Sequence, residues 1–349
     1  MSSNLSNLKF YYANLIPGVI LLFGFSSCQN TEPVEKYNGV SLVASRNKLS
    51  SEDIKPVLEV NANSVAVMPF AFLEGLESPD LKFNLDRQWY GERLDGTREA
   101  IQLLHKDSLK VMLKPQIWIR RGEFTGNIKM NSKADWKLFE ENYKEYILLF
   151  AKLAEEERVE IFSLGTELYN FVEERPEFWR DLIKETRKIY SGKLTYAENW
   201  DKIEKVTFWQ DLDYIGVDAY FPLNEGKSPS LEELRENWEP HKTAMEELAD
   251  DVGKPILFTE YGYRNIDFST KNPWDAGREN TTKNDKLQAD ALEALYREIW
   301  EEPWFAGGFL WKWHHEHQEL GGPENNQFTP QNKPAEAVVR IYYKEFGKW

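Results

Sequence analysis

The sequence predicts an α/β protein, a single domain in which eight parallel strands close into a (β/α)8 barrel, the TIM-barrel architecture. From residue 37 to residue 349, short apolar segments rich in β-branched and aromatic residues alternate with longer amphipathic segments. Eight segments of the first kind occur, and a closed barrel is the natural arrangement for eight β-α units. An open, doubly wound sheet is the alternative, but the sequence has no glycine-rich phosphate loop of the Rossmann or P-loop type.

Each predicted strand is a run of apolar and β-branched residues that is bounded by glycine, proline or polar residues. The predicted strands span 39–44, 64–72, 110–119, 159–164, 193–198, 214–220, 255–260 and 306–313. A polar segment, 265–283, follows the seventh strand. Long loops at the carboxyl ends of barrel strands commonly carry function, so this segment is expected to lie near the site.

Helices are predicted where apolar residues recur three and four positions apart. The predicted helices span 95–108, 132–157, 176–190, 230–251, 283–300 and 334–346. Ser132 is expected to cap the second helix and Pro176 to open the third. Pro240 interrupts the fourth, which is expected to kink or split there.

Charge and composition exclude some classes of partner. The net charge is −15, which argues against nucleic acid and against anionic membrane surfaces, because both are bound by basic patches. A neutral substrate is compatible with this charge. Hydrophobic residues make up 41% of the chain, enough for a large core, and the 13 tryptophans could either fill it or stack on sugar rings.

The N-terminal segment has the features of an export signal. Residues 11–25 are almost entirely apolar, which is typical of a signal-peptide core and short for a membrane span, and small residues then lead to Cys28, the single cysteine. This pattern is similar to bacterial lipoprotein signals; an ordinary signal peptide or N-terminal anchor is the alternative. We therefore expect a signal over 1–28, a tether over 29–36, and an exported protein held at the periplasmic or cell-surface side of the membrane only by a lipid on Cys28.

Two glutamates stand at the ends of predicted strands in similar surroundings. Glu167 follows the fourth strand in GTELY, and Glu260 ends the seventh in FTEYGY. In the fourth strand Ser163, Gly165 and Glu167 have the same parity, which predicts that they share one face. Because the carboxyl ends of the strands meet at one rim of a barrel, the two carboxyl groups could lie about 5–5.5 Å apart, as in retaining glycosidases.

Glycoside hydrolysis with retention needs two carboxyl groups in different protonation states. One needs a raised pKa to donate a proton to the leaving oxygen, and the other must stay ionised to attack the anomeric carbon. A single carboxylate at a strand end can equally be the partner of an Arg or Lys, but two at matched strand ends favour function. The pair therefore predicts a glycoside hydrolase, and this chemistry requires no cofactor.

The segments GTELY, GVDAYFPL, PILFTEYGY and GGFLWKW resemble glycoside hydrolase family 113, a family of retaining (β/α)8 enzymes whose characterised members act on β-1,4-mannans. The resemblance covers most of residues 38–346. It implies that Glu167 is the acid/base, that Glu260 is the nucleophile and that the substrate is mannan or a manno-oligosaccharide. Many members of the wider clan have Asn before the acid/base, whereas this chain has Thr166, so the usual contact of that Asn with the sugar 2-hydroxyl is not implied. The axial 2-hydroxyl of mannose is compatible with a changed contact.

Residues at other strand ends are predicted to bind the sugar chain. The predicted substrate-binding residues are Lys114, Trp118, Asn199, Trp200, Tyr220 and Trp311. Lys114 and Trp118 share a parity on the third strand and are expected to line a subsite. Tyr220 could donate to the nucleophile, and Trp311 is expected to form the floor under the sugar, although each aromatic could instead be a core residue. Asp218 is expected to be either part of the site or a structural acid.

Two further groups of residues compete for the site. The histidine-rich segment, HHEHQE at 314–319, contains metal-ligand residue types but lacks the HExxH spacing of zinc proteases, so no metal is expected. Glu198 ends the fifth strand, beside the fourth, and is expected to be a partner of the catalytic acids. Two other functions stay open: a glycosidase for another β-glycan, and a carbohydrate-binding barrel without catalysis.

Overall fold

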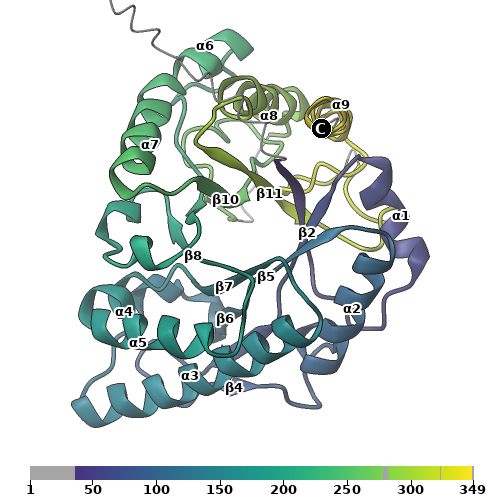
Figure 1. Ribbon diagram of the computed structural model, residues 1–349. Helices are drawn as coiled ribbons and strands as arrows, with labels where there is room; N and C mark the ends of the chain where they lie inside the picture. The colour runs from purple at the N-terminus through teal and green to yellow at the C-terminus, as the bar shows by residue number, and fades with distance from the viewer. Residues whose placement is uncertain (1–35, 278–281, 323, 348–349) are drawn as a thin grey trace, which may run out of the picture. The chain divides into compact units, whose positions relative to one another are not determined.

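Eight parallel strands close into a barrel, which confirms the predicted single (β/α)8 domain (Figure 1). The computed structural model describes residues 36–277, 282–322 and 324–347. The barrel strands are β1 (Tyr37–Leu42), β2 (Ser64–Val67), β5 (Lys110–Leu113), β7 (Ile161–Thr166), β8 (Lys193–Asn199), β9 (Ile215–Asp218), β10 (Ile256–Tyr261) and β11 (Phe305–Trp313). Around the barrel they follow one another in the order β1-β11-β10-β9-β8-β7-β5-β2.

The helices lie outside these strands (Figure 1). They are α1 (Ser51–Glu59), α2 (Leu94–Lys106), α3 (Lys133–Glu156), α4 (Tyr169–Glu174), α5 (Pro176–Arg187), α6 (Leu231–Glu236), α7 (Glu239–Val252), α8 (Asp285–Ile299) and α9 (Pro334–Phe346). The Ser132 hydroxyl accepts a hydrogen bond from the backbone N–H of Asp135 at 3.1 Å, which confirms the predicted N-cap. Pro240 stands in the first turn of α7, so the predicted fourth helix splits into α6 and α7. The prediction missed α1 and α4, which are short; α1 also contains Pro56.

Two predicted strands are each divided by a proline. Segment 64–72 forms β2 and β3 (Phe70–Leu73), and segment 110–119 forms β5 and β6 (Gln116–Ile119). Pro69 and Pro115 stand between the halves and have no N–H to donate to a strand ladder. The outer halves leave the barrel and form a second sheet with β4 (Lys82–Phe83), in the order β4-β3-β6. The prediction of single long strands is therefore wrong at these two places.

A register shift in β7 changes the direction of its side chains. The pairing of β7 with β8 shifts between Ser163 and Thr166. A Cβ on Gly165 would lie 2.5 Å from the Tyr143 hydroxyl and 3.0 Å from the Trp179 ring, both of which belong to the helix layer. The expectation that Gly165 shares a face with Ser163 is therefore wrong, because an irregularity in the ladder interrupts the alternation of faces.

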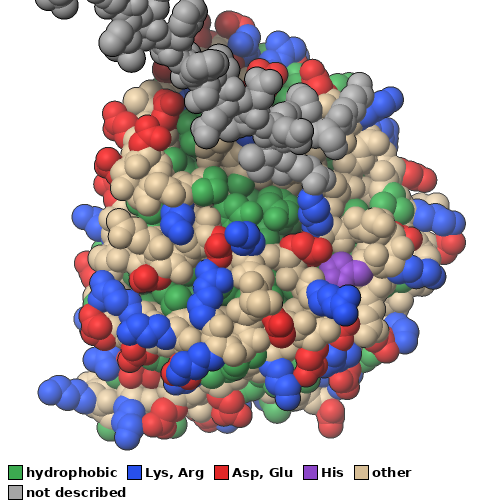
Figure 2. Space-filling model, viewed as in Figure 1, with side chains coloured by type: hydrophobic (Ala, Val, Ile, Leu, Met, Phe, Trp, Pro, Cys, Tyr) green, Lys and Arg blue, Asp and Glu red, His purple; other side chains and the backbone are tan. Residues whose placement is uncertain are grey.

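Charged side chains of both signs cover the surface. On the face shown in Figure 2, Lys and Arg side chains are interspersed with Asp and Glu. Several form exposed pairs, such as Lys55 with Glu52 at 2.6 Å. Each such pair contributes little to stability, so the fold rests mainly on the apolar layer between strands and helices.

The predicted signal over 1–28, with Cys28, and the tether up to residue 35 lie outside the described residues. The last predicted tether residue, Lys36, is described, and its ammonium group donates to the backbone oxygen of Glu302 at 2.7 Å. Over the described ranges, no helix combines the length and the hydropathy that a membrane crossing requires.

We predict that Gly165→Ala lowers the free energy of unfolding by about 1–3 kcal/mol, because the new methyl group overpacks a tight aromatic layer. Urea unfolding followed by circular dichroism measures the change. Gly75→Ala is the control, because a Cβ on Gly75 meets no atom within 4 Å. Equal stabilities of the two variants would contradict the packing proposed around Gly165.

Candidate active site

A cleft of about 760 Å³ lies at the carboxyl ends of the barrel strands. Its walls come mainly from residues that end β7 to β11 or directly follow these strands. The predicted site residues that line it are Glu167, Asn199, Trp200, Tyr220, Glu260 and Trp311. The closed sheet therefore brings together side chains that lie far apart in the sequence.

Glu260, near the end of β10, is almost completely buried and accepts hydrogen bonds from three side chains. Its Oε1 accepts from Lys114 Nζ at 2.6 Å and from Gln116 Nε2 at 3.0 Å. Its Oε2 accepts from the Tyr220 hydroxyl at 2.8 Å, as predicted for that tyrosine. Three donors, one of them charged, fix the carboxylate and stabilise its negative charge.

Glu167, directly after β7, is in a different environment. Its backbone adopts φ +49°, a left-handed conformation that is uncommon for residues other than glycine. The peptide is held there because its N–H donates to the Ala197 oxygen at 2.8 Å and its carbonyl accepts from the Thr125 hydroxyl at 3.2 Å. Burial, and then the charges of Asp218 and Glu260, raise the pKa of the Glu167 carboxyl group well above its usual range. A carboxyl group in this state can donate a proton near neutral pH.

Lys114 lies beneath the cleft and does not line a sugar subsite, so that prediction is wrong. The residue is fully buried just after β5, and its ammonium group bonds to Asp218 Oδ1 at 3.0 Å as well as to Glu260. Burial alone would lower the pKa of Lys114, but the two carboxylates outweigh it and the pKa is raised. Charge pairing therefore decides its position, and parity along a strand could not reveal this.

Asp218, which ends β9, is the structural acid of the site. Its carboxylate is fully buried and accepts from the Thr259 hydroxyl at 2.7 Å in addition to Lys114. Burial, and then the charge of Glu260, raise its pKa to about 7. The residue thus shares a cation with Glu260 and is closed off from the cleft.

Trp118 is not in the cleft with the two glutamates. It lies in β6, its side chain is 52% exposed, and it lines a second cavity of about 670 Å³. Trp118 and Lys114 do not line one subsite, because Lys114 is buried beneath the cleft whereas Trp118 lies further out, on β6 of the second sheet. The predicted part of Trp118 in substrate binding stays a prediction.

Glu198 and Trp274 are among the cleft-lining residues that were not predicted as substrate-binding. Glu198 lines the cleft with its carboxylate held by the Asn199 N–H at 2.9 Å, and burial raises its pKa to about 7. Trp274 comes from the polar segment 265–283, and its ring centroid lies 6.1 Å from that of Trp200. The polar segment was expected near the site. A tryptophan within such a segment was the signal that could have pointed to a sugar-binding residue there.

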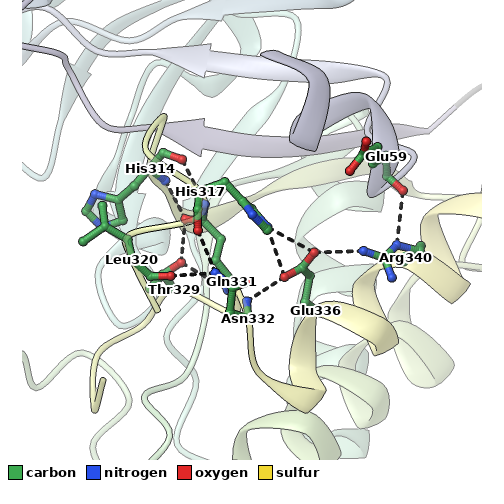
Figure 3. A network of polar contacts seen from close by, with 9 residues as sticks. All are labelled: Glu59, His314, His317, Leu320, Thr329, Gln331, Asn332, Glu336 and Arg340. Atoms are coloured by element: carbon green, nitrogen blue, oxygen red, sulfur yellow. Dashed lines mark hydrogen bonds and ion pairs between the residues drawn. The ribbon is translucent and has the colours of Figure 1, made fainter. Parts of the chain in front are cut away.

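The histidine-rich segment after β11 is tied to neighbouring backbone and side chains (Figure 3). The His314 backbone exchanges hydrogen bonds with the Gln331 amide at 2.7 and 2.9 Å, and His317 Nε2 lies 3.2 Å from Glu336. His315 Nε2 lies 3.3 Å from Ser45 Oγ instead. Among the residues that the structure describes, no group of three or more His, Cys, Asp or Glu is arranged to hold a metal ion.

We predict that Lys114→Met lowers the free energy of unfolding by about 3–5 kcal/mol at pH 7, because two buried carboxylates lose their cation. Without this cation the pKa of Asp218, which burial and the charge of Glu260 already raise to about 7, should rise further. The deficit should therefore be largest above pH 7 and shrink as the pH falls through about 7, where Asp218 takes up a proton in the wild type as well.

Urea unfolding from pH 4 to pH 8 measures this difference. The control is Lys184→Met, which removes an exposed lysine 3.4 Å from Asp181 and should have little effect at any pH. A Lys114→Met deficit that does not change with pH would contradict the charge pairing.

Comparison with known proteins agrees with this geometry. The family model of Glycoside Hydrolase Family 113 matches residues 43–333. A GH113 β-mannanase from Alicyclobacillus acidocaldarius superposes with a TM-score of 0.77 at 24% identity, over 90% of this chain and 98% of its own. A GH113 β-1,4-mannanase gives 0.75 at 24% identity, over 89% and 99%.

More distant structures share the barrel. A β-glucuronidase from Ruminococcus gnavus gives a TM-score of 0.57 at 11% identity, over 88% of this chain and 49% of its own. No curated protein sequence matches the chain. Because the family model spans most of the sequence, the protein belongs to glycoside hydrolase family 113 and is a glycoside hydrolase.

Proposed function

We propose that the protein hydrolyses β-1,4-linked mannan or manno-oligosaccharides with retention of anomeric configuration. The observation that carries the proposal is the contrast between two glutamates in one cleft. Glu260 is bonded to three donors, whereas within the described part of the chain no donor bonds to the Glu167 carboxyl group, whose pKa is raised. This contrast is what a nucleophile and a general acid require.

In the first step, Glu167 donates its proton to the glycosidic oxygen while a Glu260 oxygen attacks the anomeric carbon. The bond to the leaving sugar breaks, and a covalent glycosyl-enzyme intermediate forms. In the second step, Glu167, now ionised, takes a proton from water, which attacks the anomeric carbon and releases Glu260. The loss of negative charge on Glu260 during the first step lowers the pKa of Glu167, as its second role requires.

Mannan as the substrate class is supported by the family and by its solved members. The relatives with the higher TM-scores above are described as β-mannanases. In this chain the Thr166 hydroxyl and the Asn199 amide oxygen have no hydrogen-bond partner among the described residues. Asn199 lines the cleft, and its amide oxygen is a candidate to meet a sugar hydroxyl when substrate binds, whereas the Thr166 hydroxyl is buried beside Glu167.

We predict that Glu260→Gln lowers kcat on mannan by about 10³-fold or more while oligosaccharide binding persists, because the amide cannot form the intermediate. Glu167→Gln should lower kcat/KM by about 10²–10⁴-fold on mannan, and far less on an aryl glycoside, because its leaving group needs no proton in the first step. In the wild type, kcat should fall as the pH rises through the raised pKa of Glu167, since only the protonated form donates. This fall should be absent from the aryl-glycoside reaction of Glu167→Gln.

Product analysis on mannan, glucomannan, xylan and cellulose measures the rates and identifies the glycan. Glu177→Gln is the control, because its side chain is 82% exposed on α5. Turnover by Glu260→Gln at the wild-type rate would refute the mechanism. A wild type that cleaves only xylan or cellulose would refute mannan and leave the mechanism standing.

We also propose, from the sequence alone, that the chain is exported and lipidated on Cys28. We predict that Cys28→Ala abolishes incorporation of labelled palmitate and moves the enzyme from the membrane fraction to the soluble fraction of a bacterial host. Labelling followed by fractionation measures both. Cys28→Ala that still labels and stays in the membrane fraction would show that the anchor is elsewhere.

A further inference from the structure

A second cavity, of about 670 Å³, lies on the part of the rim that the catalytic cleft does not use. It is lined by β3, by β6 and by the segments that follow β1, β3 and β4, whereas the cleft is formed mainly by the ends of β7 to β11. The segment 118–124 joins the two, because Trp118 and Arg120 line the second cavity and Phe124 lines the cleft.

The exposed tryptophans are concentrated in these two hollows. Within the described ranges, the tryptophans with large exposure are Trp89 (41%), Trp118 (52%) and Trp274 (47%). Trp89 and Trp118 line the second cavity and Trp274 lines the cleft. Large exposed aromatic rings that gather in a hollow indicate a binding surface, and flat rings suit the apolar faces of sugars.

One wall of the second cavity begins at the nucleophile. Gln116 donates to Glu260 at 3.0 Å, and Trp118 is two residues further along the same face of β6. On the neighbouring β3, Phe70 pairs with Gln116 and Phe72 with Trp118. A single sheet face therefore leads from the catalytic carboxylate to the exposed tryptophan.

We propose that the second cavity binds sugar units of the same neutral oligosaccharide chain that lie remote from the bond being cleaved. The inference rests on the proposed hydrolysis of a β-linked glycan. Acidic and basic side chains both line the cavity, and Arg120 pairs with Glu74 at 3.1 Å, which suits a ligand of hydroxyl groups without net charge. The Arg46 guanidinium lies 4.7 Å from the Trp89 ring centroid and supports that ring.

The test compares Trp118→Ala with wild type on β-1,4-manno-oligosaccharides of increasing length. The kcat/KM of Trp118→Ala, divided by that of wild type, should fall as the oligosaccharide becomes longer. On the longest oligosaccharide the loss should be about three- to tenfold, and most of it should be a rise in KM. Trp118→Phe keeps a ring and should recover most of the loss. Ile341→Ala, which alters a side chain that is 61% exposed on α9, is the control and should match wild type at every length.

A loss that is equal at all lengths, or no loss at any length, would overturn the proposal. The oligosaccharides are also titrated into Glu260→Gln and into the double variant Glu260→Gln/Trp118→Ala. The dissociation constant of the double variant should exceed that of Glu260→Gln by a factor that grows with oligosaccharide length. If the wild type cleaves another β-glycan, mannan as the substrate is refuted. The same length series on oligosaccharides of that glycan then tests separately whether the second cavity binds sugar units.

Discussion

The ammonium group of Lys114 lies between two buried carboxylates, and the arrangement of the catalytic end of the barrel depends on it. Asp218 and Glu260 come from neighbouring strands and could not both be ionised in an apolar interior without a cation between them. The Lys114 ammonium group lies 2.6 Å from Glu260 Oε1 and 3.0 Å from Asp218 Oδ1. The remaining negative charge acts on Glu167, whose pKa is raised.

The carboxyl groups of Glu167 and Glu260 have different surroundings because the backbone places the two residues differently. Glu260 belongs to β10, whose pairing with β9 shifts between Phe258 and Glu260, and its side chain reaches donors that follow β5 and β9 or belong to β6. Glu167 stands just past the register shift of β7, in a left-handed conformation held by hydrogen bonds from its N–H to the Ala197 oxygen and from the Thr125 hydroxyl to its carbonyl. The two carboxyl groups therefore stand in different electrostatic surroundings, set by local geometry and by the number of donors to each.

The prolines that follow β2 and β5 give the barrel a second sheet at its rim. By stopping the barrel ladder they let β3 and β6 extend beyond the rim as a separate sheet. One face of that sheet carries Gln116 against the nucleophile and Trp118 in the open cavity. In the binding proposed above, a substrate chain longer than the cleft would contact this face of the second sheet. The second sheet therefore suits a polymeric substrate.

The sequence by itself determined the eight strands, most of the helices and the two glutamates at matched strand ends. These depend on local periodicity and on the rule that the strand ends of a parallel barrel share one rim. Only the tertiary structure decided that Lys114 supports Glu260, that Gly165 faces the helices and that Trp118 lines its own cavity. These outcomes depend on which charges meet across the barrel, on the register shift between β7 and β8, and on the prolines that interrupt two strands. None of these effects produces a periodic pattern along the sequence.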